Sequence, residues 1–236
     1  MTEIEIECKI CRRGVKTIYD AQFDVDYYYC RNCGFIFMDH EKIVPQEQEK
    51  KRYLAHINRR EDTGYVNMLK RFIETGVKPF CKEMNTALDF GSGPGPVLAE
   101  LLIEMGYEVD IYDIYFAPKK VYRSKTYDLI TCTEVLEHVK NPLEILKTLE
   151  KHLNPGGILS VMTLFHPVDG CLPGEEAFKT WWYRRDPTHI SFFRPETFQY
   201  ISGLLGMTIL MMDKKNIVSF AKHPTGKNVK TIKNVR

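Results

Sequence analysis

An aspartate followed by three glycines at alternate positions is the clearest sign of chemistry in this sequence. Asp89 lies at the end of a predicted apolar strand, and the glycines are Gly91, Gly93 and Gly95. A backbone without Cβ atoms can approach a bound molecule closely. The carboxylate of Asp89 would repel a pyrophosphate, and the spacing differs from the G-x-G-x-x-G of dinucleotide sites. We therefore expect a ligand with amino or hydroxyl groups.

Two Cys-x-x-Cys pairs lie near the N-terminus, with 18 residues between them. This spacing is typical of a tetrahedral, structural zinc site, because four thiolates leave no open position for a substrate. The alternatives are accidental spacing, or one redox pair beside two buried thiols, and the match to ribbon spacing favours zinc. The expected zinc ligands are Cys8, Cys11, Cys30 and Cys33.

A long insertion after a predicted strand gathers aromatic, basic and titratable side chains. It runs from Phe165 to His189 and holds both tryptophans of the chain. Loops of this length are usually functional. His189 is the expected general base because imidazole titrates near neutral pH. Tyr183 and His166 are further catalytic candidates, although a structural role is favoured for His166. For His189, a structural role in satisfying backbone groups is an equal alternative. The two arginines after Tyr183 are expected to pair with an acidic group of a substrate.

Predicted elements suggest how these side chains are positioned. Strand and helix patterns alternate after residue 80, as in a mostly parallel α/β sheet. Residues 207–212 and 217–221 predict a terminal antiparallel hairpin, and a helix before the glycine turn is expected to stop at Gly76. Because 13 residues separate Asp113 from Tyr127, the third strand of the sheet is expected to be vestigial.

From about residue 86 to residue 223, these segments resemble the class I S-adenosylmethionine-dependent methyltransferases. Asp89 and the three glycines match the family motif (D/E)-x-G-x-G-x-G, and Leu136-Glu137-His138 is a sequence common in the family. The resemblance implies a Rossmann-like fold and S-adenosylmethionine as cofactor, with Asp113 on the ribose. A turn aspartate is the alternative for Asp113. The cofactor-binding residues implied are Asp89, Gly91, Ser92, Gly93, Gly95, Asp113, Thr133 and Glu134.

Four segments are expected along the chain: a zinc ribbon at 1–41, a helical cap or linker at 42–80, the S-adenosylmethionine-binding domain at 81–223 and a basic, flexible tail at 224–236. The net charge of +2 argues against a protein that coats nucleic acid. The N-terminus is charged and no apolar run is long enough to span a membrane, so we expect a soluble, cytoplasmic protein.

The leading hypothesis is an enzyme that transfers a methyl group from S-adenosylmethionine to a small-molecule acceptor, either a metabolite, a sugar-like compound or an aromatic one. A four-cysteine motif joined to this core is similar to the sugar C-methyltransferases. One alternative is an RNA methyltransferase that uses the zinc ribbon for substrate recognition, and the near-neutral charge tilts against it. The other is a non-catalytic ligand-binding protein on the same fold.

Overall fold

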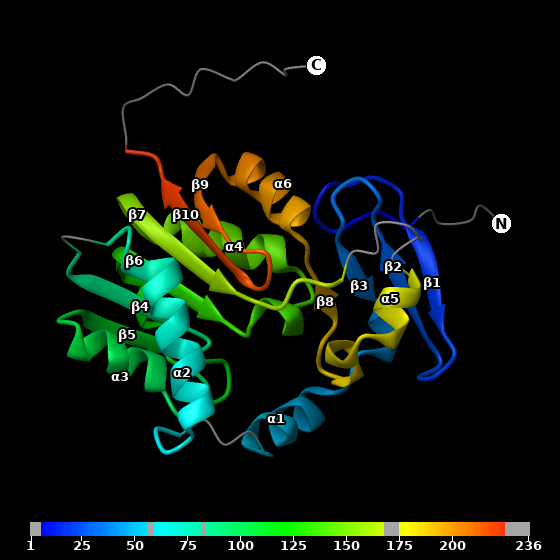
Figure 1. Cartoon of the computed structure of the whole chain (residues 1–236), viewed down its shortest axis with the longest axis horizontal. Coiled ribbons are helices and arrows are strands. Elements are labelled where there is room, and N and C mark those ends of the chain that lie inside the picture. The colour runs from blue at the N-terminus through cyan, green and yellow to red at the C-terminus, as the bar shows by residue number, and fades with distance from the viewer. Residues whose placement is uncertain (1–5, 56–58, 82–83, 168–174, 225–236) are drawn as a thin grey trace.

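The computed structural model describes residues 6–55, 59–81, 84–167 and 175–224. A six-stranded sheet with helices on both faces lies beside a smaller four-stranded sheet (Figure 1). Among the described residues, no helix combines the length and apolar character needed to cross a bilayer. The predicted basic tail lies almost wholly outside the described residues.

The large sheet is mostly parallel, with strand order β5-β4-β6-β7-β10-β9. β4 pairs in parallel with β5 and β6, β6 pairs in parallel with β7, and β10 runs antiparallel to β7 and β9. The predicted parallel sheet and terminal hairpin are therefore present. The carboxyl ends of the parallel strands share one edge, where such sheets bind ligands. The bounds are β4 (Thr86–Phe90), β5 (Glu108–Tyr112), β6 (Tyr127–Thr133), β7 (Leu153–Met162), β9 (Met207–Met212) and β10 (Ile217–Lys222).

Between β5 and β6 the chain forms no further strand of this sheet. Residues 114–126, all described, contain a single bridge from Asp113 to Ala117 and a short 3-10 helix, η3 (Val121–Ser124). The expected vestigial third strand is thus reduced to an isolated bridge. As a result the loop after Asp113 stays close to the glycine turn.

Side chains alternate between the two faces of the large sheet, and each face packs against its own layer of helices. α2 (Thr63–Phe72) and α3 (Val97–Glu104) pack on the face that includes Ala87 and Leu129. α4 (Pro142–Lys151) and α6 (Pro195–Leu205) pack on the opposite face (Figure 1). Successive strand residues point to opposite faces, so both faces of the parallel strands are apolar.

Gly76 does not end its helix, contrary to expectation. α2 continues into a π-helical turn, η2 (Ile73–Val77), that contains Gly76. A Cβ atom at Gly76 would lie 2.7 Å from Ser160 Oγ and 2.9 Å from Ile217 Cγ2. The hydroxyls of Ser160 and Ser219 donate to the Gly76 carbonyl at 3.1 and 2.7 Å. The glycine therefore allows the helix to approach the sheet closely.

The small sheet crosses the boundary expected at residue 41. Its order is β1-β2-β3-β8, with β1 (Lys16–Asp20), β2 (Val25–Tyr29), β3 (Ile36–Met38) and β8 (Ser191–Phe192). Phe35 packs on Phe193 with ring centroids 5.2 Å apart, and Thr197 Oγ1 donates to the Cys33 carbonyl at 2.8 Å. The cysteine-bearing segment thus shares strands and core with the rest of the molecule.

Candidate active site

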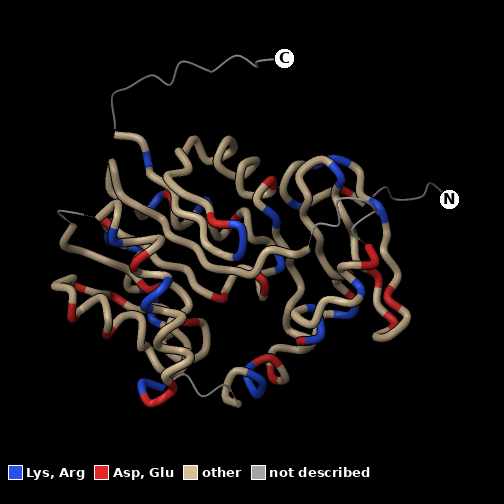
Figure 2. Tube along the Cα trace, viewed as in Figure 1, with Lys and Arg blue, Asp and Glu red and all other residues tan. Residues whose placement is uncertain are grey.

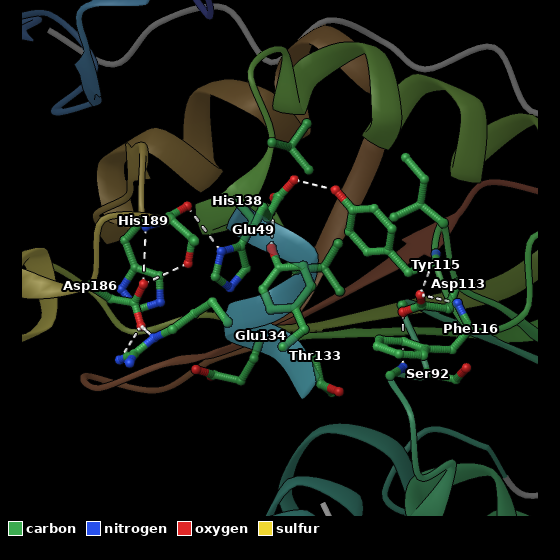
Figure 3. Close-up of a pocket in the computed structure, with 18 of the residues that line it drawn as sticks. Glu49, Ser92, Asp113, Tyr115, Phe116, Thr133, Glu134, His138, Asp186 and His189 are labelled. Carbon is green, nitrogen blue, oxygen red and sulfur yellow. Dashed lines mark hydrogen bonds and ion pairs between the residues drawn. The ribbon is translucent and has the colours of Figure 1, made fainter. Parts of the chain in front are cut away.

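A cavity of about 930 Å³ opens at the carboxyl ends of the parallel strands, within the size range of small-molecule sites. Figure 3 shows its elongated arrangement, with Ser92 and Asp113 at one end and Asp186 and His189 at the other. The segment after β6, which begins with Glu134, lies between them. Helix α1 (Gln46–Ala55) contributes a further part of the wall.

The glycine turn forms one end of the cavity. Gly91 and Gly93 have φ values of +86° and +66°, which glycine adopts without strain. A Cβ atom at Gly91 would lie 2.1 Å from Val135 Cγ2. Ser92 Oγ is buried with no hydrogen-bond partner among the described residues, so a ligand hydroxyl or amine could satisfy it. Gly95 does not line the cavity, and its carbonyl accepts from the Val97 amide at the start of α3.

Asp113 combines a turn role with a free acceptor position. Its Oδ1 accepts from the amides of Tyr115 and Phe116 at 2.8 and 3.0 Å, and Oδ2 accepts from the Gly93 amide at 3.0 Å. A carboxylate offers about four lone-pair sites, so one site on Oδ2 is left. The turn role weighed in the sequence is therefore present without blocking a bond to a ligand hydroxyl.

Asp89 is 2% exposed at the floor of the cavity. Thr131 Oγ1 donates to Asp89 Oδ1 at 2.9 Å. Burial raises the pKa of Asp89 to about 7, and the nearby carboxylate of Asp113 adds to the rise. The side chain therefore changes charge near neutral pH, and a cationic ligand group would favour its ionised form.

Thr133 and Glu134 follow directly from β6 and line the cavity. Glu134 has a φ of +52°, a left-handed backbone conformation that residues other than glycine rarely adopt. Its amide donates to the Met162 carbonyl of β7 at 2.8 Å. Burial, followed by the neighbouring carboxylate of Glu137, raises the pKa of Glu134 well above its ordinary value. The strained turn holds this carboxyl beside the cavity.

His189 lies in the cavity wall, and its hydrogen bond leaves one nitrogen available. Nδ1 is 2.7 Å from the Tyr183 carbonyl, which can only accept, so Nδ1 carries the proton and Nε2 holds a lone pair. Burial lowers the pKa of His189, and the imidazole is therefore neutral at pH 7. A neutral imidazole with a free Nε2 has the protonation state that a general base requires.

The structure corrects two catalytic expectations. His166 does not line the cavity: it is 4% exposed, and its Nε2 is 2.7 Å from the Gly34 carbonyl in the second cysteine pair's turn. Burial lowers its pKa to about 4, and its place is structural. Tyr183 does line the cavity, but burial raises its pKa well above the ordinary value, so it remains a hydrogen-bond donor instead of a base.

The two arginines after Tyr183 lie in different environments. Arg184 is 3% exposed and forms an ion pair with buried Asp20, so it is unavailable to a substrate. Arg185 is exposed and lines the cavity. Of the two tryptophans, Trp182 lines the cavity and Trp181 packs on Phe178 and Phe192. Residues 168–174 of the same insertion lie outside the described residues.

Helix α1 supplies cavity residues that sequence reasoning missed. Glu49 accepts from the hydroxyls of Tyr53 and Tyr115 at 2.8 and 2.5 Å. Arg52 Nε donates to Asp186 at 2.9 Å, which joins the helix to the insertion before β8. No residue of α1 is buried. The helix sequence also has no apolar stripe, which is the pattern by which a packed helix is recognised in a sequence.

The four cysteines of the two pairs come together as predicted. Cys8 Sγ lies 3.6 Å from Cys33 Sγ, and Cys11 Sγ lies 3.3 Å from Cys30 Sγ. All four sulfur atoms lie within 4.8 Å of one another, and each is a free thiol. A zinc tetrahedron with bonds of about 2.3 Å would place its sulfurs about 3.8 Å apart, close to this arrangement.

Comparison with known proteins agrees with the fold. A family profile described as a methyltransferase domain matches residues 55–209. Ubiquinone biosynthesis O-methyltransferases from Colwellia psychrerythraea and Photobacterium profundum are 30% identical over 79 residues and 35% identical over 80 residues. Each match covers 34% of this chain, and 32% and 34% of those proteins, so the similarity spans about a third of these curated relatives.

A solved structure of an O-methyltransferase family protein from Burkholderia thailandensis shares the fold, with a TM-score of 0.53 and 14% identity. The comparison covers 75% of this chain and 64% of that one. The family profile covers more than half of the chain and includes the glycine turn, all parallel strands and the insertion before β8. The chain therefore belongs to the methyltransferase domain family, as its motifs predicted.

Proposed function

We propose that this protein transfers a methyl group from S-adenosylmethionine to an oxygen atom of a small-molecule acceptor. The main support is the composition of a single cavity. The glycine turn and two carboxylates lie at one end of it, and a neutral imidazole lies at the other. Its volume suits small molecules. Oxygen is the favoured acceptor atom because the curated relatives are named as O-methyltransferases.

The residues at the glycine turn fit S-adenosylmethionine. Asp113 has an acceptor position for a ribose hydroxyl, and ionised Asp89 would attract the amino group of the methionine moiety. Ser92 Oγ has an unused hydrogen-bonding position, and Thr133 with Glu134 would lie along the middle of the molecule. Gly91 and Gly93 line the cavity and present no side chain to it.

At the other end, the chain's own groups can take a proton from an acceptor hydroxyl. The free lone pair of His189 Nε2 is the proton acceptor that we assign, with Tyr183 donating to Glu134 and Glu137 at 3.1 and 2.5 Å. The oxygen then attacks the methyl carbon, the carbon–sulfur bond breaks, and its electron pair remains on sulfur. The exclusion of water by Tyr53 and Tyr183 would favour this displacement.

Isothermal titration calorimetry tests the cofactor. The wild type should bind S-adenosylmethionine, and Gly93→Val should abolish binding by placing a branched side chain at the cavity wall. Gly156→Val is the matched control because Gly156 also has a positive φ, +81°, but has open space around its Cβ position and does not line the cavity. Binding of NADH without binding of S-adenosylmethionine would refute the proposal.

Turnover separates an enzyme from a ligand-binding protein on the same fold. Methyl-labelled S-adenosylmethionine should label a phenol or another hydroxylated small molecule in a panel of acceptors. Labelling of RNA in the same assay would support the RNA methyltransferase alternative instead. Acidic and basic residues are interspersed along the described trace (Figure 2), and the net charge of +2 does not favour RNA as the acceptor.

We also propose that the cluster of Cys8, Cys11, Cys30 and Cys33 binds one structural zinc ion. The support is the close set of four free sulfurs joined to turns with left-handed backbone at Arg12 and Gly34. Elemental analysis of protein purified without chelators should give one zinc per chain. A metal-free protein with normal folding would contradict this assignment.

A further inference from the structure

A second group of metal-ligating side chains lies in the methyl-acceptor end of the cavity. The carboxylate of Glu137 and the imidazoles of His138 and His189 offer ligand atoms that all lie within 4.8 Å of one another. Glu137 and His138 belong to η4 (Leu136–His138), which follows β6, and His189 belongs to the insertion before β8. Two segments 50 residues apart in sequence are held together by the amide of Ile190, which donates to the Glu137 carbonyl at 2.7 Å.

Both histidines are oriented as metal ligands usually are. His138 Nδ1 lies 3.0 Å from the Thr188 carbonyl, and His189 Nδ1 lies 2.7 Å from the Tyr183 carbonyl. A carbonyl can only accept, so each Nδ1 bears the proton and each Nε2 keeps its lone pair. Backbone carbonyls that fix the tautomer in this way are the common support of histidine ligands. The ring centroids lie 4.8 Å apart and both rings line the cavity, so the two imidazoles are neighbours in its wall.

Glu137 provides an independent sign of a missing partner. The residue is 0% exposed, Oε1 accepts from the Tyr183 hydroxyl at 2.5 Å, and Oε2 has no hydrogen-bond partner among the described residues. The same hydroxyl lies 3.1 Å from Glu134, so it is shared between two buried carboxyl groups. An unpaired buried carboxylate oxygen is costly, and a cation beside it would remove that cost.

We propose that Glu137, His138 and His189 bind a divalent transition-metal ion in the wall of the cavity. Two imidazoles and one carboxylate are a ligand set used by zinc and by non-haem iron(II), and it leaves coordination positions open. Bonds of about 2.0–2.2 Å would place the ligand atoms roughly 3–3.5 Å apart, which is compatible with atoms that lie within 4.8 Å of one another. His138 and His189 line the cavity, so the open positions would face the acceptor.

The catalytic use of this ion rests on the proposed methyl transfer, whereas its binding does not. An acceptor hydroxyl bound to a divalent ion has a lower pKa, so the acceptor would bind as its anion, its proton having passed to bulk solvent. His189 would then hold the ion, and the lone pair assigned above to proton transfer would be occupied. Binding of S-adenosylmethionine at the glycine turn requires neither role.

Cobalt(II) titration of the zinc-loaded protein tests the site. One equivalent of zinc per chain is first added to the metal-free protein, so that it fills the four-thiolate cluster and leaves the cavity site empty. Co²⁺ binding is then followed by calorimetry and by visible absorption. We expect one further equivalent of Co²⁺, with d–d bands and without the thiolate-to-cobalt charge-transfer band that the cysteine cluster would give. His138→Gln and His189→Gln should each weaken Co²⁺ binding by at least about tenfold.

His152→Gln is the matched control. His152 also places Nδ1 3.0 Å from a backbone carbonyl, that of Lys125, but it lies outside the cavity, so its replacement should leave Co²⁺ binding unchanged. If a cavity histidine variant fails to fold, the isosteric Glu137→Gln replaces it. The proposal is overturned if the zinc-loaded wild type binds no Co²⁺ at millimolar concentration, or if the cavity variants bind it as tightly as the control. Loss of S-adenosylmethionine binding with intact Co²⁺ binding would refute the proposed function alone.

Discussion

Affinity for the S-adenosyl ligand should depend on pH through Asp89. This carboxyl is 2% exposed, and burial raises its pKa to about 7 in the protein without ligand. Below pH 7 the side chain is mostly protonated and neutral, whereas the ligand's amino group carries a positive charge. Binding to the ionised carboxylate must then first remove a proton, so the apparent affinity falls as the pH falls.

The size of the effect follows from the pKa. If only ionised Asp89 binds the amino group, the apparent Kd scales as one plus ten to the power of the pKa minus the pH. This factor is about 1.3 at pH 7.5 and about 33 at pH 5.5 for a pKa of about 7. The Kd should therefore rise roughly 25-fold, equivalent to about 1.9 kcal/mol. The range stays below the α-amino pKa of about 7.7–8.0, so the ligand keeps its charge.

Calorimetry with S-adenosylhomocysteine, which has the same amino group and does not react, measures this dependence. Asp89→Asn should bind more weakly at pH 7.5 and should lose the dependence on pH. Asp110→Asn is the matched control because Asp110 lies in the neighbouring strand β5 and pairs with Lys125 outside the cavity. A flat affinity in the wild type, or an unchanged slope in Asp89→Asn, would refute the reasoning.

Three further variants test other parts of the structure. His189→Ala should lower the chemical rate by about 10²–10⁴-fold with little change in cofactor affinity, whereas a lower melting temperature with normal turnover would indicate a packing role. Gly76→Ala should destabilise the protein by about 1–3 kcal/mol in urea unfolding because its Cβ would contact Ser160, and equal stability with Gly203→Ala, which has open space, would contradict this. Cys30→Ser should lower the melting temperature of the whole protein in one transition, since the small sheet shares its core. A separate early transition would instead show an independent ribbon.

Local signals explain the parts of the fold that the sequence predicted. Gly206 adopts the left-handed conformation expected at a helix end, and Pro195 occupies the first turn of α6. β9 spans the residues expected, and β10 extends one residue beyond them. The glycine turn was recognisable because the spacing of its glycines was combined with Asp89 before it and with the matching segments downstream.

Contacts between distant segments explain what was not predicted. His166 is drawn to the Gly34 carbonyl, 132 residues earlier, by the packing of the cysteine turns on the core. Arg184 likewise forms an ion pair with a residue far away in the sequence, Asp20. Nothing in the sequence indicates that Glu137 is buried. Its carbonyl accepts from the amide of Ile190, which follows the insertion before β8.

A crystal structure with S-adenosylhomocysteine tests the central claim most directly. The account predicts the ligand in the cavity between Gly93 and Thr133, with a ribose hydroxyl hydrogen-bonded to Asp113 and the amino group near Asp89. Electron density for the ligand outside this cavity, or a ribose with no contact to Asp113, would contradict it.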